Sequence, residues 1–224
     1  RRNASRAAIA AAAAWAWPGA GGSAAAAMAP IEPYLMASSE QEIALARSAA
    51  PASIAGHASV MVLGEHGYGT AVKGTNGFVC LVVRSWDHEL DEKSAVFWNP
   101  KFHAPYCLNA SGARYELRLY LMRTRWVIAG ASQKEMAARE RAAWAAGELR
   151  RPEPGALCYM MSKRADLGQG PWYPHVMFYL PHARTSSWGA NLPGVPIMAG
   201  AGDHTTIFFV LVPSWSDGTP APRS

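Results

Sequence analysis

Apolar runs separated by turn residues dominate the middle and the end of the chain. Six of these runs carry β-branched or aromatic residues, which is typical of β-strands; they cover positions 60–63, 69–73, 78–85, 156–162, 175–180 and 205–212. Glycine-rich turns separate the first three runs, and the dipeptide Asn76-Gly77 is a strong tight-turn signal because both residues tolerate a positive φ. The first three runs are therefore expected to form an antiparallel meander.

Two segments carry clear helix signals. Residues 38–50 open with two serines as candidate N-caps, place carboxylates in the first turn and end at Pro51. Ser132 and Glu135 have the spacing of a capping box, and the helix that follows is expected to run to Leu149, where two nearby prolines stop it.

A third segment, residues 109–124, fits two periodicities. Positions 115, 119, 122 and 126 share one helical stripe, whereas positions 115, 117, 119 and 121 alternate as they would in a strand. The length of the segment and a cap at Asn109 or Ser111 favour a helix.

Two other segments show no clear period. Residues 86–107 are expected to be an ordered loop with at most one short helical turn, and residues 181–204 a long loop that is functional or mobile. Strands and helices thus occur in separate runs. This order predicts an α+β fold, α-βββ-αα-βββ, with a mainly antiparallel sheet of about six strands and three helices, rather than alternating βαβ units.

The first 29 residues resemble a cleavable signal peptide. Three arginines precede an apolar run at positions 7–17, and the small residues that follow suit cleavage after Ala26, Ala27 or Ala29. Residues 1–29 are therefore expected to be a signal peptide and residues 30–224 a single α+β domain that is exported, to the periplasm or secreted. An alanine-rich tail retained in the mature protein is the alternative.

Removal of this segment changes how the charge is interpreted. The formal charge of +5 includes three leading arginines; without them, 18 Lys and Arg residues face 16 Asp and Glu residues, a net of +2. Global basicity therefore gives no argument for nucleic acid as a partner. No later segment approaches the roughly 20 apolar residues of a spanning helix, so no membrane span is expected.

The chain has three cysteines, Cys80, Cys107 and Cys158. In an oxidising compartment, an odd number leaves at least one unpaired thiol or an intermolecular bond. A disulfide between Cys80 and Cys107 would close a modest loop and stabilise the fold by about 3–4 kcal/mol in the chain-entropy model. Three buried, reduced cysteines are the alternative.

The seven histidines lack the spacing of a compact metal motif, so no metal site is predicted. A site assembled across the fold could use Glu65 and His66, in a glycine-rich turn, with His175 at the start of a strand. Cys107 could instead act as a nucleophile, with His66, His103 or His175 as its base. Ordinary hydrogen-bonded histidines and a disulfide are the simpler interpretations.

Basic residues gather between Arg114 and Arg151, where eight arginines and Lys134 face four glutamates. Glu135 and Arg139 have the i,i+4 spacing of a solvated helix pair, which is the simpler interpretation. An acidic small ligand or a polyanionic wall polymer is the alternative.

Tryptophans fall at the ends of expected strands or in loops, at positions 86, 98, 172, 188 and 215. Several of them could line one mouth of the sheet and stack on a sugar, an aromatic or an apolar ligand. The simpler interpretation is that they cap the ends of the core.

Four runs, at positions 74–82, 97–101, 154–163 and 188–194, resemble a family of uncharacterised exported bacterial proteins. The resemblance covers most of the chain after the signal peptide. It implies a bacterial source and export, and it implies neither an activity nor site residues.

Together these features predict an exported binding module for a small or carbohydrate-like ligand, held in a cleft lined by aromatic and histidine side chains. The residues expected to line the cleft are Glu65, His66, Tyr68, Trp172, His175, Trp188 and His204. The expected partner is a small molecule or a polysaccharide, not nucleic acid, and the sequence identifies no cofactor. An exported hydrolase that uses a metal or Cys107 in the same cleft is the alternative.

Overall fold

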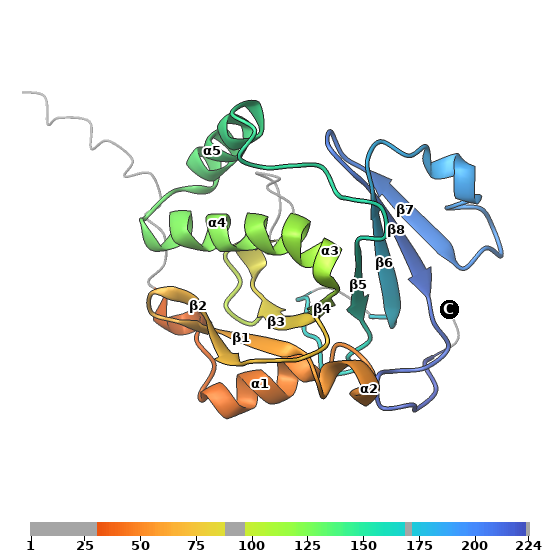
Figure 1. The fold of residues 1–224 in the computed structure, drawn as a ribbon, viewed down its shortest axis with the longest axis horizontal. Coiled ribbons are helices and arrows are strands. Elements are labelled where there is room, and N and C mark those ends of the chain that lie inside the picture. The colour runs from red at the N-terminus through yellow and green to blue at the C-terminus, as the bar shows by residue number, and fades with distance from the viewer. Residues whose placement is uncertain (1–30, 88–96, 169–171, 223–224) are drawn as a thin grey trace, which may run out of the picture.

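The computed structural model describes residues 31–87, 97–168 and 172–222, so the expected signal peptide lies outside the described residues. Figure 1 shows the fold. The helices are η1 (Glu32–Tyr34), α1 (Ser39–Arg47), α2 (Ala52–Ala55), η2 (Ser85–Asp87), α3 (Ala110–Gly112), the π-helical turn η3 (Ala113–Leu117), α4 (Arg118–Ile128), α5 (Gln133–Ala145) and η4 (Thr185–Trp188). The strands are β1 (Ser59–Gly64), β2 (Gly67–Val72), β3 (Val79–Val83), β4 (Ala104–Leu108), β5 (Leu157–Met160), β6 (His175–Leu180), β7 (Ile197–Ala201) and β8 (Thr206–Leu211).

One sheet of eight strands runs through the described residues in the order β2-β1-β3-β4-β5-β6-β8-β7. Neighbouring strands are antiparallel except β1 and β3, which are parallel. The α+β class and the mainly antiparallel sheet are therefore confirmed, whereas the expected size of about six strands was too small.

The two strands that sequence reasoning missed are β4 and β7, which lie in the segments expected to be loops. β4 contains Pro105, a residue that usually argues against an interior strand because it has no N–H to donate. Pro105 lies opposite Val82, whose carbonyl accepts from Tyr68 Oη at 2.7 Å and from Arg84 Nη1 at 2.5 Å. β7 consists mostly of small residues with low strand propensity, and its pairing with β8 holds it in place.

The expected meander is wrong, because β3 pairs with β1 and not with β2. After β2 the chain crosses back beneath the start of β1, where the backbone N–H of Thr75 donates to the His57 carbonyl at 2.8 Å. Asn76 Nδ2 donates to the Ile54 carbonyl, also at 2.8 Å. Gly74 makes this crossing possible, because a Cβ there would lie 2.1 Å from the Ser59 nitrogen.

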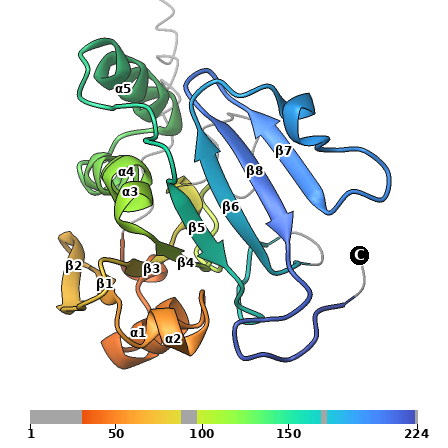
Figure 2. The same cartoon turned by 45° about the vertical axis from the view of Figure 1, so that its right-hand side comes forward.

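Helices cover the two faces of the first half of the sheet. α1 packs on β1, β3 and β4, and α4 lies on the other face, so that this half has three layers (Figure 1). The strands β6, β8 and β7 twist away from these layers (Figure 2). Within the described residues, no helix has the length and apolar character needed to span a membrane.

Residues 109–124, which fit both a helical and a strand periodicity, are helical, and a capping residue at their start favours the helix. Asn109 is the N-cap, since its Oδ1 accepts from the Gly112 N–H at 2.8 Å. α3 then passes through the π-helical turn η3 into α4. The capping box of Ser132 and Glu135 at the start of α5 is also confirmed.

A chain of serines connects the N-terminal helix to the end of the described chain. Ser48 Oγ lies 2.7 Å from Ser162 Oγ, and Ser216 Oγ donates to the Ser48 carbonyl at 2.6 Å. The Ser216 N–H also donates to the Met161 carbonyl at 2.9 Å. The segment after β8 is therefore attached both to the end of α1 and to the segment that follows β5.

Candidate functional site

Glu65 and His66 form the exposed tip of the hairpin between β1 and β2. Gly67 closes this turn with a φ of 108°, a conformation that favours glycine. Tyr68 follows on β2, but its ring packs into the core and its hydroxyl is bonded to Val82. Of these three predicted site residues, only the first two face solvent.

Trp172 and His175 lie together at the start of β6, with ring centroids 4.7 Å apart in an edge-to-face contact. His175 is buried and Nδ1 lies 2.9 Å from the Tyr173 carbonyl, which places the proton on Nδ1. Burial lowers the pKa of His175 and favours the neutral ring. His175 Nε2 and Trp172 Nε1 are buried without a hydrogen-bond partner among the described residues.

The last two predicted site residues lie on the far half of the sheet. Trp188, at the end of η4, is 38% exposed and stacks on Phe208 with ring centroids 4.3 Å apart. His204, between β7 and β8, stacks on Trp144 with centroids 3.9 Å apart. These contacts fasten η4 to the sheet and the β7–β8 connection to α5.

The predicted site residues thus form three groups rather than one cleft. The β1–β2 hairpin lies at one edge of the sheet, whereas η4 and the β7–β8 connection lie near the other edge (Figure 1). In the part of the chain that the structure describes, no hydrogen bond, ion pair or ring contact joins the three groups. The same residues include no cluster of three or more His, Cys, Asp or Glu side chains arranged to hold a metal ion.

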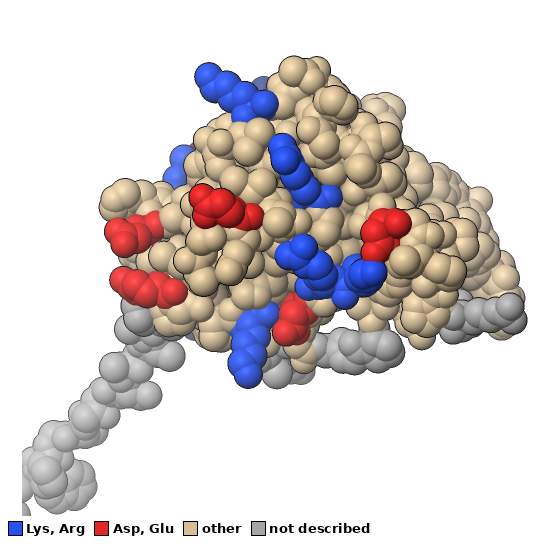
Figure 3. Space-filling model, turned by 90° about the horizontal axis from the view of Figure 1, so that it is seen from below, with Lys and Arg blue, Asp and Glu red and all other residues tan. Residues whose placement is uncertain are grey.

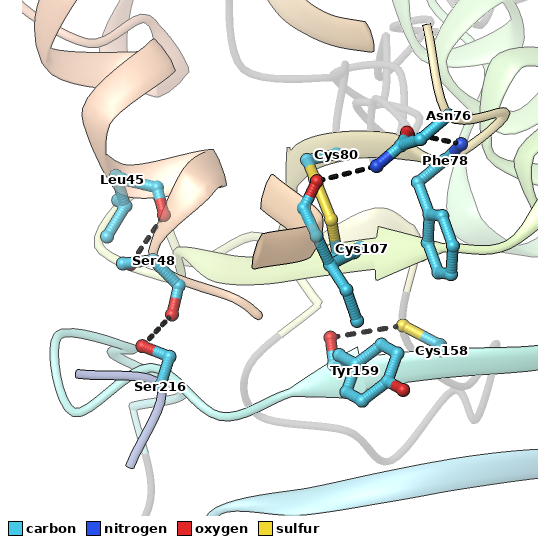
Figure 4. Close-up of a disulfide and its surroundings, with 10 residues drawn as sticks. Leu45, Ser48, Asn76, Phe78, Cys80, Cys107, Cys158, Tyr159 and Ser216 are labelled. Carbon is cyan, nitrogen blue, oxygen red and sulfur yellow. Dashed lines mark hydrogen bonds between the residues drawn. A yellow bond between two sulfur atoms is a disulfide. The ribbon is translucent and has the colours of Figure 1, made fainter. Parts of the chain in front are cut away.

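Cys80 and Cys107 are direct partners across β3 and β4, with Cα atoms 4.0 Å apart, and a disulfide joins them (Figure 4). Cys107 therefore lies in a strand, not in the expected loop, and has no free thiol to act as a nucleophile. Cys158 is free but belongs to the core on the other face of the sheet. Burial raises its pKa well above the usual range, which makes it an inert thiol.

A hollow lined by arginine lies beside α3, η3 and the start of α4. It has a volume of about 280 Å³ and is lined by Ser111, Arg114, Tyr115, Arg118, Arg150, Arg151 and Glu153. Arg150, Arg151 and Glu153 belong to the segment between α5 and β5. This segment passes the N-terminal end of α3 in both views (Figures 1 and 2). Segments distant in the sequence therefore build one basic surface.

Asn109 holds the two sides of this hollow together. Its Oδ1, which caps the helix, also accepts from the Leu157 N–H at 3.2 Å, and its Nδ2 donates to the Gly155 carbonyl at 2.8 Å. One side chain thus fixes the start of the helix against the segment that carries Arg150 and Arg151.

A second hollow continues along the same helix. It has a volume of about 490 Å³ and is lined by Ala113, Arg114, Leu117, Arg118, Leu121 and Arg125. The two hollows share Arg114 and Arg118, and we refer to both together as the arginine groove.

The arginine groove carries an excess of positive charge. Five arginines line it, and Glu153 is the one acidic residue among its described lining residues. Glu153 is already engaged, because its Oε2 accepts from Arg114 Nη2 at 2.5 Å and from Nε at 3.1 Å. This contact raises the pKa of Arg114 and lowers that of Glu153. On the side that carries α1 and α2, by contrast, acidic and basic side chains are interspersed (Figure 3).

The eight arginines between positions 114 and 151 have different roles. Arg123 is buried and structural: it bonds the Glu140 carboxylate at 2.8 and 3.1 Å and the Asp87 carbonyl at 2.6 Å. Arg139 and Arg141 are exposed on α5 and do not line the groove. The other five line the groove.

A buried carboxyl group lies within the π-helical turn. Glu116 is 9% exposed, and its Oε1 accepts from Tyr120 Oη at 2.8 Å. Burial raises the pKa of Glu116 to about 7, against the opposing effects of the Tyr120 hydrogen bond and the Arg123 charge. This carboxyl therefore changes its charge near neutral pH.

The arginine groove was not among the predicted site residues, although the sequence shows the excess of arginine from which it is built. The i,i+4 charge pairs of a solvated helix favoured the simpler interpretation. Two signals were available: Arg118 and Arg125 are seven positions apart, and Arg150-Arg151 precede two prolines that prevent a further helix.

Comparisons with known proteins give no relative. No protein-family model, no curated protein and no solved structure matches this chain.

Proposed function

We propose that this chain is an exported binding protein that holds an acidic ligand in the arginine groove. The observation that carries the proposal is the convergence of Arg114 and Arg118 with Arg150 and Arg151 on one hollow, from segments that Asn109 fastens together. Like charges in proximity repel one another, so such a cluster is best stabilised by a bound anion.

The chemistry of arginine supports a carboxylate or phosphate as the recognised group. Guanidinium groups present fixed forks of N–H donors, which pair with these planar or multidentate anions through two parallel hydrogen bonds. Arg118, Arg150 and Arg151 are exposed, and among the described residues Glu153 is hydrogen-bonded to Arg114 alone. Three guanidinium groups therefore remain available to a ligand.

A matched pair of sugars tests this proposal. Isothermal titration calorimetry with the disaccharide digalacturonate should show binding, and its neutral methyl ester should not bind. Two double variants distinguish binding in the groove from attraction by the overall charge. Arg118→Gln with Arg151→Gln removes two arginines that line the groove. Arg139→Gln with Arg141→Gln removes two exposed arginines of α5.

Loss of the lining pair should weaken binding by at least about tenfold, since a hydrogen bond to a charged group contributes about 1.5–3 kcal/mol. Loss of the α5 pair should leave the affinity within about twofold at physiological salt, where distant exposed charges are screened. Equal binding of the ester, or equal losses in both variants, would contradict the proposal.

A further inference from the structure

We infer that the arginine groove is built for a linear acidic polysaccharide, with carboxylates at intervals along its chain, rather than for one small anion. This inference rests on the proposed function and extends it. The first observation is that the groove continues: the second hollow shares Arg114 and Arg118 with the first and ends at Arg125.

The spacing of the arginines fits a ligand with repeated charges. Arg118 and Arg125 are seven positions apart on α4, which at 1.5 Å per residue corresponds to about 10 Å along the helix axis. On the other side of Arg118, the first hollow adds Arg150 and Arg151. A single small anion would contact the arginines of the first hollow, whereas an extended chain would also reach Arg125.

The surface between the charges is apolar. Leu117 and Leu121 line the second hollow between the arginines, and both are partly exposed. A polysaccharide presents the less polar faces of its rings between its acidic groups, and such faces suit an apolar strip flanked by polar anchors. The order of charged and apolar positions in the groove therefore matches the order of groups along this ligand.

The aromatic content of the groove argues against a single-stranded nucleic acid. Sequence-independent binding of single strands uses exposed aromatic rings on which the bases stack. Tyr115 is the one aromatic residue among the described lining residues, and its ring is packed on Tyr179 with centroids 5.5 Å apart. Bases would find no free ring here.

A length series tests the inference separately from the proposed function. A disaccharide is expected to occupy the first hollow, whose volume is about 280 Å³, whereas an octasaccharide is expected to extend along both hollows. The longer oligomer should bind at least tenfold more tightly than the disaccharide, beyond the statistical gain from its repeated units. Arg125→Gln should remove most of this gain, because Arg125 lines the part of the groove that only the longer oligomer reaches, whereas Arg139→Gln should leave the gain unchanged, because Arg139 lines neither hollow.

The outcomes distinguish the two proposals. Binding of the disaccharide without a gain for the octamer, or a gain that survives Arg125→Gln, overturns the linear ligand and leaves the acidic ligand in place. Absence of binding at both lengths overturns both proposals. Tighter binding of a single-stranded oligonucleotide with the same number of charges would overturn the polysaccharide.

Discussion

Glu42 and Arg84 form an ion pair, with 3.0 Å between Glu42 Oε1 and Arg84 Nη2, and both side chains are almost fully buried. Arg84 Nε also donates to the Tyr34 carbonyl at 2.9 Å, and the Leu63 N–H donates to Glu42 Oε1 at 3.0 Å. The pair thus connects α1 to β1 and to the end of β3.

Replacement of Glu42 by alanine should lower the free energy of unfolding by about 3–5 kcal/mol, because it removes the ion-pair partner of the buried Arg84 charge. Urea denaturation followed by circular dichroism measures this change. Gln41→Ala, at an exposed position of the same helix, should stay within about 0.5 kcal/mol of the wild type. A loss of less than 1 kcal/mol for Glu42→Ala would show that water reaches Arg84.

Asn191 covers the outer edge of β7, the last strand of the sheet. Its Nδ2 donates to the Ala199 carbonyl and its Oδ1 accepts from the Ala199 N–H, both at 2.9 Å. Its backbone has a φ of 63°, which glycine also tolerates, so Asn191→Gly removes the two bonds without adding strain.

We expect Asn191→Gly to cost about 1–2 kcal/mol of stability and to promote self-association, because the freed strand edge can pair with another chain. Analytical ultracentrifugation across a concentration series measures the association. His182→Gly is the matched control, because His182 is also exposed, also has a positive φ of 48°, and makes no side-chain hydrogen bond among the described residues. A monomeric Asn191→Gly variant would contradict the expected role of this edge.

Gly74 is the position at which the chain crosses beneath β1. Because an added Cβ would lie 2.1 Å from the Ser59 nitrogen and 2.3 Å from the Ala58 carbonyl carbon, Gly74→Ala must displace backbone. We expect it to destabilise the fold by about 2–3 kcal/mol, as measured by thermal and urea unfolding. Gly69→Ala, where a Cβ would meet nothing within 4 Å, is the matched control and should be nearly neutral.

Glu116 should make stability depend on pH. Because burial raises its pKa from 4.5 to about 7, the folded state favours the protonated carboxyl. The contribution of Glu116 to the free energy of unfolding is therefore fully present below about pH 4.5, declines as the pH rises to about 7, and is lost above that value.

Glu116→Gln keeps a neutral acceptor for Tyr120 and should remove this dependence. The variant should match the wild type near pH 4.5 and exceed its stability by about 3 kcal/mol at pH 8, since the pKa rises from 4.5 to about 7 and one pKa unit corresponds to about 1.4 kcal/mol. Urea unfolding at both pH values gives the difference, in which the titration of other groups cancels. If the difference in unfolding free energy between the two proteins were the same at both pH values, the pKa of Glu116 would be an ordinary one.

Local signals predicted most of the elements. The capping residues Ser38, Asn109 and Ser132 all begin helices where the sequence places them. Local patterns could not show pairing, because the position of β3 beside β1 depends on the packing of Gly74 beneath another segment. They also concealed β4, since the strand signal around Pro105 is weak and its place in the sheet comes from its neighbours.

Chemical type alone does not identify the site residues, because the fold uses several of the predicted ones for packing. Tyr68 and His175 are hydrogen-bonded to backbone carbonyls, and Trp188 lies on Phe208. The arginine groove depends on Arg118 and Arg150 meeting across 32 positions, which a reading of local spacing cannot supply. The excess of positive charge is visible in the sequence, whereas the place at which the arginines gather depends on the fold.

The serine contacts between α1 and the end of the described chain bear on the order of folding. Ser48 and Ser216 are 168 positions apart, so their bond closes after almost all of the intervening chain is in place. Contacts of such long range are entropically costly to form early and slow the folding of a domain. We therefore expect the segment after β8 to dock last, onto an α1 that is already packed on the nearby strands β1, β3 and β4.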